Sequence, residues 1–327
     1  MSLPDVTRRM FDASDKKRDA GLTTPDDIIR YDDISYGEFE KWNLLDVYRP
    51  KNIKNTEGTE KKNSKSTDMK RLPVIVSCHG GGWVYGDKDV YQYYCMSLAE
   101  RGFAVVNYSY RLAPEDRFPA SVLDTDSVFR WIYAHSLEYG FDTDNVFAVG
   151  DSAGANLLGI YLNLMNDEKY VEKVNSYMQN KDFNDEKSET YNNIIFKPQD
   201  NLKIKAVALN CGKYSFTSEK NNAGLKDLAC FLFEDNGTDE ELDLIDVIPH
   251  VNEKFPPAYV MTATGDFLMK DAGKLCGRLE DIGVPFEYHF YADGEKPLGH
   301  VFHCNMRLDM ASVCNDDECR FFRKYIG

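Results

Sequence analysis

Long hydrophobic runs are missing from this sequence. No apolar stretch within its 327 residues reaches the roughly 18 residues that a membrane-spanning helix needs. Residues 1–30 also contain no apolar segment that resembles the core of a signal peptide. We therefore expect a soluble protein that is located in the cytoplasm and does not associate with membranes.

Clusters of basic residues are also missing. Lysine and arginine total 39 against 54 aspartate and glutamate residues, which gives a formal net charge of -15. Nucleic acids and anionic membranes are bound through grouped lysine and arginine side chains. The composition therefore excludes a nucleic-acid partner and favours a small-molecule substrate, while the question of a homo-oligomer stays open.

The eight cysteines have neither the pattern of a disulfide framework nor that of a zinc site. Several lie singly in apolar segments, as Cys78 and Cys211 do, which predicts free buried thiols. The C-terminal Cys314 and Cys319 do not have the spacing of a standard zinc site. No metal ion is therefore predicted.

Short apolar runs alternate with helical patterns along the chain. The runs are PVIVSC from Pro73, FAVVNYSY from Phe103, NVFAVG from Asn145, IKAVALN from Ile204, PAYVMTA from Pro257 and FEYHFY from Phe286. Helical patterns cover residues 90–101, 120–139, 153–164, 271–282 and 305–325. This alternation predicts an α/β fold with a mostly parallel sheet flanked by helices. WNLLDVYRP, from Trp42, is predicted to be an antiparallel edge strand, and the polar segments 52–70 and 166–201 interrupt the alternation.

The pentapeptide GDSAG, from Gly150 to Gly154, follows an apolar run and begins a helical pattern. A G-x-S-x-G nucleophile elbow needs this context, because its serine lies on a strained strand-to-helix turn that exposes the hydroxyl above the sheet. Glycine at both ends leaves room for the turn. An ordinary glycine turn that matches by chance would need neither the strand nor the helix. We therefore predict that Ser152 is a catalytic nucleophile.

The motif HGGGW, which begins at His79, ends the run PVIVSC. Its successive glycines leave backbone N–H groups unshielded, and an acyl-transfer enzyme needs such donors where the oxyanion forms. Gly81 and Gly82 are predicted to supply two donors of this oxyanion hole, and Ala153 the third. For His79 we predict a structural hydrogen bond within the loop.

A nucleophilic serine needs a base, and the base needs an acid that orients it. His300 and His303 follow the last predicted strand; His300 lies in a glycine-containing loop and is the predicted base, whereas His303 is expected to pack. The acid should follow a strand between the serine and the histidine. Asp266 does so, whereas Asp271 is explained as an acid in the first turn of the next helix. Asp266 is therefore the predicted acid.

These motifs give the sequence a resemblance to a known family. HGGGW, YRLAPEDRFPA from Tyr110, GDSAG, and GDFLMKDAGKLCGRLEDIGVPFE followed by GHVF resemble the hormone-sensitive-lipase-like family of α/β hydrolases over about residues 74–302. The resemblance implies the α/β-hydrolase fold, hydrolysis of carboxylic esters through an acyl-enzyme intermediate, and no cofactor. It also implies that residues 1–30 form an N-terminal cap segment on a catalytic domain of residues 31–327, with a cap insertion around residues 213–251.

The chain departs from the family pattern near the predicted site. Asp266-Phe267-Leu268 stands where the family usually has Asp-Pro-Leu, and His300-Val301-Phe302 where it has His-Gly-Phe. Both departures put the pocket shape in question and leave the predicted triad intact.

Two other functions stay open. An amidase or formamidase uses the same kind of triad, and a non-catalytic ligand-binding protein can be built on the same fold. The presence of all three triad residues favours the enzyme. With a mean hydropathy of -0.50 and polar cap segments, the chain offers little apolar surface to a lipid phase. We therefore expect small esters with short acyl chains, roughly acetyl to butyryl, because each further buried methylene needs apolar surface.

Overall fold

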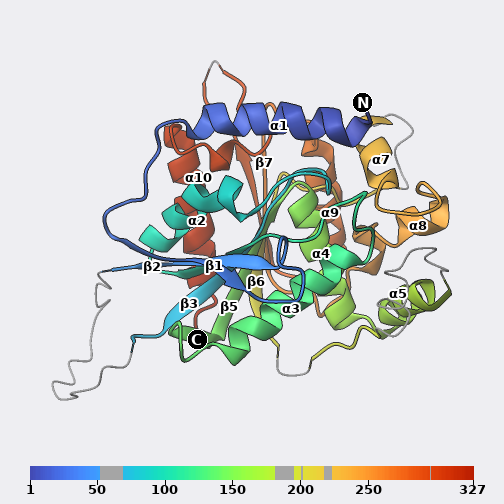
Figure 1. Cartoon of the computed structure of the whole chain (residues 1–327), viewed down its shortest axis with the longest axis horizontal. Helices are drawn as coiled ribbons and strands as arrows, with labels where there is room; N and C mark the ends of the chain where they lie inside the picture. The colour runs from blue at the N-terminus through green and yellow to red at the C-terminus, as the bar shows by residue number, and fades with distance from the viewer. Residues whose placement is uncertain (52–68, 181–194, 200–201, 217–222, 295) are drawn as a thin grey trace.

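A central β-sheet organises the chain (Figure 1). The structure, a computed structural model, describes residues 1–51, 69–180, 195–199, 202–216, 223–294 and 296–327. The sheet has eight strands in the order β1-β2-β4-β3-β5-β6-β7-β8. They are β1 (Ile28–Ser35), β2 (Leu44–Pro50), β3 (Leu72–Cys78), β4 (Ala104–Tyr108), β5 (Phe141–Asp151), β6 (Ile204–Asn210), β7 (Ala258–Ala263) and β8 (Phe286–Tyr291).

Strands β3 to β8 pair in parallel, whereas β1 and β2 are antiparallel at one edge. The predicted mostly parallel sheet is thus confirmed, and the strand predicted after Trp42 is antiparallel as expected. Its predicted place at the edge is wrong, because β1 pairs with its outer side and is itself the edge strand. β1 was not predicted. Its sequence, IIRYDDIS, is largely polar and most of its residues are partly or fully exposed, so it lacks the apolar run by which the buried strands were recognised.

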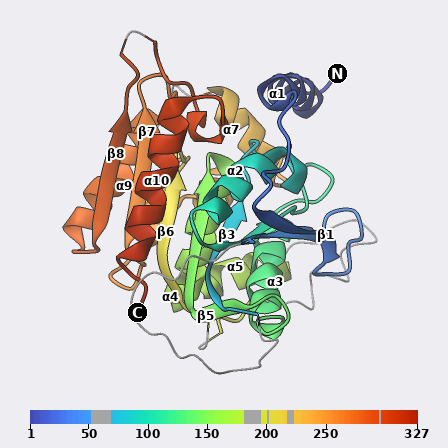
Figure 2. The same cartoon turned by 90° about the vertical axis from the view of Figure 1, so that its left-hand side faces the viewer.

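Helices cover both faces of the sheet. The α-helices of the described residues are α1 (Leu3–Asp19), α2 (Lys88–Glu100), α3 (Ala120–Ala134), α4 (Ala153–Asn166), α5 (Glu168–Asn180), α7 (Ala223–Cys230), α8 (Asp239–Asp243), α9 (Met269–Asp281) and α10 (Asp309–Arg323). Side chains of α2 and α10 form one apolar cluster with the sheet, and those of α3, α4 and α9 form the other; α2 and α10 lie in front of the sheet in Figure 2. The buried strand β3 contributes side chains to both clusters, because Val74 and Val76 face one side of the sheet and Ile75 faces the other.

The five predicted helices are confirmed, whereas α1, α5, α7 and α8 were not predicted. Tyr170, Val174 and Met178 lie four residues apart on α5 and are fully buried, so a narrow apolar stripe holds an otherwise polar helix against the core. Most of the polar segment 52–70 lies outside the described residues. No helix within the described ranges is both long enough and apolar enough to cross a membrane.

The direction in which the chain winds reverses at the centre of the sheet. β3 is followed by β4 on one side, and β5 to β8 continue on the other side of β3. Cys78, at the end of β3, pairs with Gly150, near the end of β5. Open α/β sheets bind their ligands at such a switch point, outside the carboxyl ends of the strands. The fold therefore brings the loops HGGGW and GDSAG together at this edge.

Candidate active site

Ser152 lies on a strained turn between β5 and α4. Its φ is 52° and its ψ is -116°, a conformation that non-glycine residues rarely adopt. A Cβ atom on Gly150 would lie 2.7 Å from the backbone of Gly154, and one on Gly154 would overlap the carbonyl oxygen of Cys78. The two glycines are therefore needed for the sharp turn that the sequence predicted.

The glycine loop after β3 presents backbone donors beside Ser152. Gly81 and Gly82 have φ values of 118° and 62°, and a Cβ atom on Gly81 would overlap the carbonyl oxygen of Tyr85. Ala153 is the first residue of α4, so its N–H points out of the helix end. Within the part of the chain that the structure describes, these three N–H groups donate no hydrogen bond to the protein.

His79 supports the glycine loop, as predicted. Its Nδ1 donates to the carbonyl oxygen of Gly80 at 2.7 Å, and its ring stacks on Tyr110 with centroids 4.0 Å apart. The Tyr110 hydroxyl in turn donates to the carbonyl oxygen of His79 at 3.0 Å. Burial lowers the pKa of His79 to about 4, so this ring stays neutral near pH 7.

His300 and Asp266 form a hydrogen-bonded pair on the neighbouring loops after β8 and β7. His300 Nδ1 lies 2.7 Å from Asp266 Oδ1. The same oxygen accepts the Leu268 N–H at 3.0 Å, and Oδ2 accepts the Thr262 hydroxyl at 2.6 Å. Burial alone would raise the pKa of Asp266, but the hydrogen bonds and charge of His300, together with the other two donors, hold it below its usual value. The carboxylate is therefore ionised and fixed in place.

The two loops are joined through their backbones. Gly265 and Gly299, which precede the acid and the histidine, form an isolated parallel bridge, and the Gly265 N–H donates to Leu298 O at 2.7 Å. A Cβ atom on Gly265 would lie 2.7 Å from that oxygen. The contact sets the distance between the acid and the histidine.

The two rejected candidates lie elsewhere. His303 is fully buried and packs edge-on against Tyr94, with ring centroids 4.9 Å apart, and burial lowers its pKa to about 3. Asp271 lies in the first turn of α9, as predicted, but its carboxylate is buried and forms an ion pair with Lys213 at 2.9 Å. Both residues thus have structural partners of their own.

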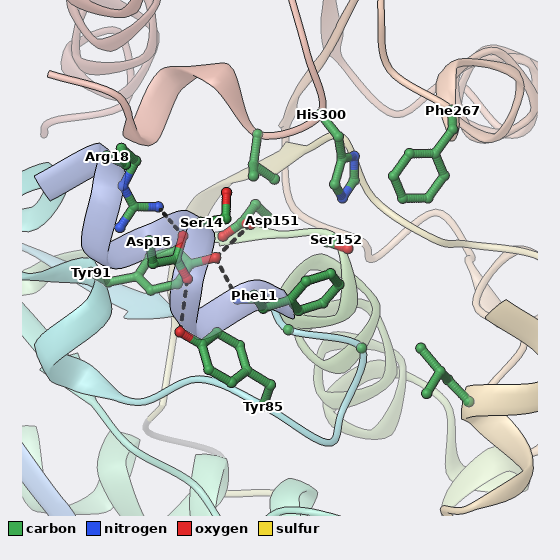
Figure 3. Close-up of a pocket in the computed structure, with 15 residues that line it drawn as sticks. Phe11, Ser14, Asp15, Arg18, Tyr85, Tyr91, Asp151, Ser152, Phe267 and His300 are labelled. Atoms are coloured by element: carbon green, nitrogen blue, oxygen red, sulfur yellow. Dashed lines mark hydrogen bonds and ion pairs between the residues drawn. The ribbon is translucent and has the colours of Figure 1, made fainter. Parts of the chain in front are cut away.

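A cavity of about 260 Å³ opens above Ser152 (Figure 3). Besides Ser152, the glycine loop and His300, its lining comprises Phe11, Ser14, Asp15, Arg18, Tyr85, Tyr91, Asp151, Leu228, Phe267 and Val301. In Figure 3 the charged residues lie on one side of Ser152, His300 lies directly above it, and Phe267 lies on the other side. The Phe267 ring packs 4.3 Å from that of His300 and is 58% exposed, so this departure from the family pattern forms part of the cavity rim.

Helix α1 lies across the carboxyl ends of the strands (Figure 1) and supplies four of the lining residues. Polar contacts attach it to the body: Arg8 donates to the carbonyl oxygens of Val84 and Ala113, and Arg18 donates to that of Val90. Only Pro4 and Thr7 of this helix are buried. The helix therefore covers the cavity with little apolar contact.

Among the described residues, two groups of side chains have ligand atoms close enough to share a metal ion: Asp151, His303 and Cys304, and Cys211, Asp266 and His300. Members of both groups already bond to protein partners. Cys304 Sγ lies 3.5 Å from His303 Nε2, and Asp266 and His300 are bonded to each other. We assign no metal ion to either group.

Some residues that line the cavity or support Asp266 were not predicted from the sequence. Thr262, which donates to Asp266, is the one threonine in the apolar strand PAYVMTA, and that position was its only signal. Asp151 was read only as the variable position of G-x-S-x-G. Asp15 and Arg18 resemble any other charges of a polar helix, because only the tertiary structure places them over Ser152.

Residues 75–303 match a family model described as the alpha/beta hydrolase fold. The chain is similar to versiconal hemiacetal acetate esterase from Dothistroma septosporum, with 27% identity over 226 residues, which cover 67% of this chain and 64% of that protein. It is also similar to carboxylesterase NlhH from Mycobacterium tuberculosis, with 38% identity over 97 residues, which cover 29% of this chain and 30% of that protein. The chain thus spans less than two thirds of the length of each relative. Its fold is similar to that of Esterase B from Lactobacillus rhamnosis, with a TM-score of 0.76 and 21% identity over 98% of this chain and 93% of that one.

Proposed function

This chain belongs to the α/β-hydrolase family, as its resemblance to the hormone-sensitive-lipase-like members predicted, and we propose that it is a serine carboxylesterase acting on small, short-acyl esters. The observation that carries the proposal is the 2.7 Å hydrogen bond between His300 and Asp266 beside a cavity that Ser152 also lines. The similarity to proteins named as carboxylesterases and esterases supports the same reaction.

The proposed reaction begins at Ser152. His300 accepts the hydroxyl proton at Nε2 while Oγ attacks the ester carbonyl carbon, and Asp266 holds the proton on Nδ1 and stabilises the imidazolium. The oxyanion of the tetrahedral intermediate accepts hydrogen bonds from the N–H groups of Gly81, Gly82 and Ala153. His300 then returns the proton to the leaving alcohol, which leaves an acyl-enzyme on Ser152.

Water completes the cycle. His300 accepts a proton from water as its oxygen attacks the acyl carbon, and the second tetrahedral intermediate collapses to release the carboxylic acid and the free serine. The N-terminal end of α4 favours negative charge at the oxyanion in both steps.

The cavity volume supports small substrates. About 260 Å³ lies below the roughly 300–1,000 Å³ of pockets that hold drug-sized ligands. Residues 1–30 and the segment around residues 213–251, of which 217–222 lie outside the described residues, form the proposed cap. The proposal includes a cytoplasmic location and no nucleic-acid partner, and it leaves the oligomeric state open.

Labelling and hydrolysis test the proposal together. A fluorophosphonate probe should label the purified protein at Ser152, and the protein should hydrolyse p-nitrophenyl acetate and butyrate. Ser152→Ala should lose both properties and keep its Tm. Labelling of wild type at another residue, or no hydrolysis by a folded wild type, would contradict the serine esterase.

Two further comparisons bear on the details. Faster hydrolysis of an anilide or formanilide than of the matched ester would favour the amidase instead. A rate maximum at decanoyl or longer esters would contradict the short-acyl preference and leave the triad in place.

A further inference from the structure

The cavity above Ser152 has a charged half that ester hydrolysis does not require. Asp15 and Arg18 reach it from α1, and Asp151 reaches it from the end of β5. Tyr85 and Tyr91 complete this half, and Figure 3 draws the group on one side of Ser152. A cavity that only had to hold an alkyl ester would gain more from apolar side chains here.

The positive charge in this half is already engaged. Arg18 donates through Nε and Nη2 to Asp19, both at 2.7 Å, and through Nη1 to Asp15 at 2.9 Å. Its Nη2 also donates to the carbonyl oxygen of Val90 at 2.7 Å. One guanidinium therefore faces two carboxylates, and Asp151 adds a third acid near by.

The acids keep spare capacity to accept hydrogen bonds. Asp15 accepts from Arg18 on one oxygen and from the Tyr85 hydroxyl at 2.9 Å on the other, whereas a carboxylate offers about four acceptor positions. Asp151 accepts the Tyr91 hydroxyl at 2.7 Å. Burial raises the pKa of Asp15 and raises that of Asp151 to about 7. Both shifts arise because the loss of water around the carboxyl groups outweighs the neighbouring donors and the charge of Arg18.

We infer that the ester substrate carries a hydrogen-bond-donating group, in its simplest form a primary ammonium, which Asp15 and Asp151 bind in the charged half of the cavity. This inference rests on the proposed esterase function, because it concerns the far end of the same substrate. An ammonium supplies positive charge together with N–H donors. An anionic substituent at the same place meets acids whose only cationic neighbour in the lining is already paired.

Isosteric ester pairs test the inference. On the acyl side, methyl hexanoate is compared with methyl 5-aminopentanoate, and on the alcohol side pentyl acetate is compared with 4-aminobutyl acetate. In each pair a terminal methyl becomes an ammonium, and acid release is followed by pH-stat titration near pH 7. In one pair, kcat/KM should be about tenfold or more higher for the ammonium ester, because a hydrogen bond to a charged group contributes about 1.5–3 kcal/mol. The pair that responds shows which side of the ester enters the charged half.

Two matched variants localise the effect. Asp15→Asn should reduce the ammonium-to-methyl ratio of kcat/KM by about tenfold, since the amide keeps the shape and loses the charge. Asp12→Asn removes the same charge from the same helix, but the Asp12 side chain is about half exposed and pairs with Lys16 at 2.8 Å. Its ratio should equal that of wild type.

The outcomes separate the two proposals. If a folded wild type hydrolyses neither member of any pair, the esterase function fails. If it hydrolyses the methyl-ended esters as fast as the ammonium esters, only this inference fails. Equal loss of the ratio in Asp12→Asn and Asp15→Asn would assign the preference to the overall negative charge and would overturn the role of Asp15.

Discussion

Replacing Asp266 by asparagine removes a charge and leaves a side chain of the same shape. In the structure, Oδ1 accepts from both His300 Nδ1 and the Leu268 N–H, whereas Oδ2 accepts from the Thr262 hydroxyl. A hydroxyl can turn and accept instead of donating, but a backbone N–H cannot. The amide should therefore keep its oxygen toward His300 and place its nitrogen toward Thr262.

This orientation sets the size of the expected effect. The His300 ring keeps its proton on Nδ1, so the loss comes from the missing negative charge next to the imidazolium. Unit charges about 4 Å apart interact by about 4 kcal/mol at an effective dielectric constant of about 20, which corresponds to a loss of about 10³-fold in kcat/KM. A flipped amide would impose the wrong tautomer, for which a loss of about 10⁴-fold is known in another serine enzyme.

Asp271→Asn provides the matched comparison. It weakens the buried ion pair with Lys213, so it should lower the free energy of unfolding by about 3 kcal/mol and leave kcat/KM within a few-fold of wild type. Asp266→Asn should show the opposite combination, a large kinetic loss with a Tm close to that of wild type. Hydrolysis of p-nitrophenyl butyrate and calorimetry would measure both properties. A loss below tenfold in Asp266→Asn, or the larger kinetic loss in Asp271→Asn, would refute the assignment of the acid.

Three other predictions follow from the same structure. His300→Ala should abolish hydrolysis, whereas His303→Ala should lower Tm and keep kcat/KM within about tenfold, because His303 is buried against Tyr94; the reverse order would mean that His303 is the base. Burial lowers the pKa of His303 to about 3, so the folded state holds this ring neutral, whereas the unfolded chain protonates it below pH ~6.5. The contribution of His303 to the free energy of unfolding is therefore fully present above pH ~6.5 and is lost as the pH falls toward 3. Asp151 and Glu318, whose pKa values burial raises to about 7, change the free energy of unfolding with pH in the opposite sense. The test therefore compares the slope of the free energy of unfolding against pH in wild type and in His303→Asn, and the two slopes should differ by up to about 1.4 kcal/mol per pH unit. Equal slopes would contradict the prediction. Deleting residues 1–25 should change KM and acyl preference more than Tm, because α1 buries only Pro4 and Thr7; unchanged kinetics would show that the segment is no cap.

The sequence was sufficient where the structure depends on short-range geometry. The turn at Ser152 requires glycine at 150 and 154 because neighbouring backbone leaves no space for a Cβ atom, and the buried strands carry apolar runs because both of their faces are covered. Such constraints act within a few residues, so the strand, turn and helix around GDSAG could be read in chain order. The choice of Asp266 followed from its position just after a strand, and that of His300 from its place in the glycine-containing loop after the last strand.

The tertiary structure alone decided how distant segments meet. α5 and β1 are polar sequences that become ordered because a narrow stripe or one face contacts the body. The charged half of the cavity depends on α1, which is joined to the body by side-chain bonds to backbone carbonyls, such as that of Arg18 to Val90, 72 residues away. Any backbone carbonyl can accept such a bond, so no residue pattern marks the partner, and the sequence by itself does not determine which charges lie above Ser152.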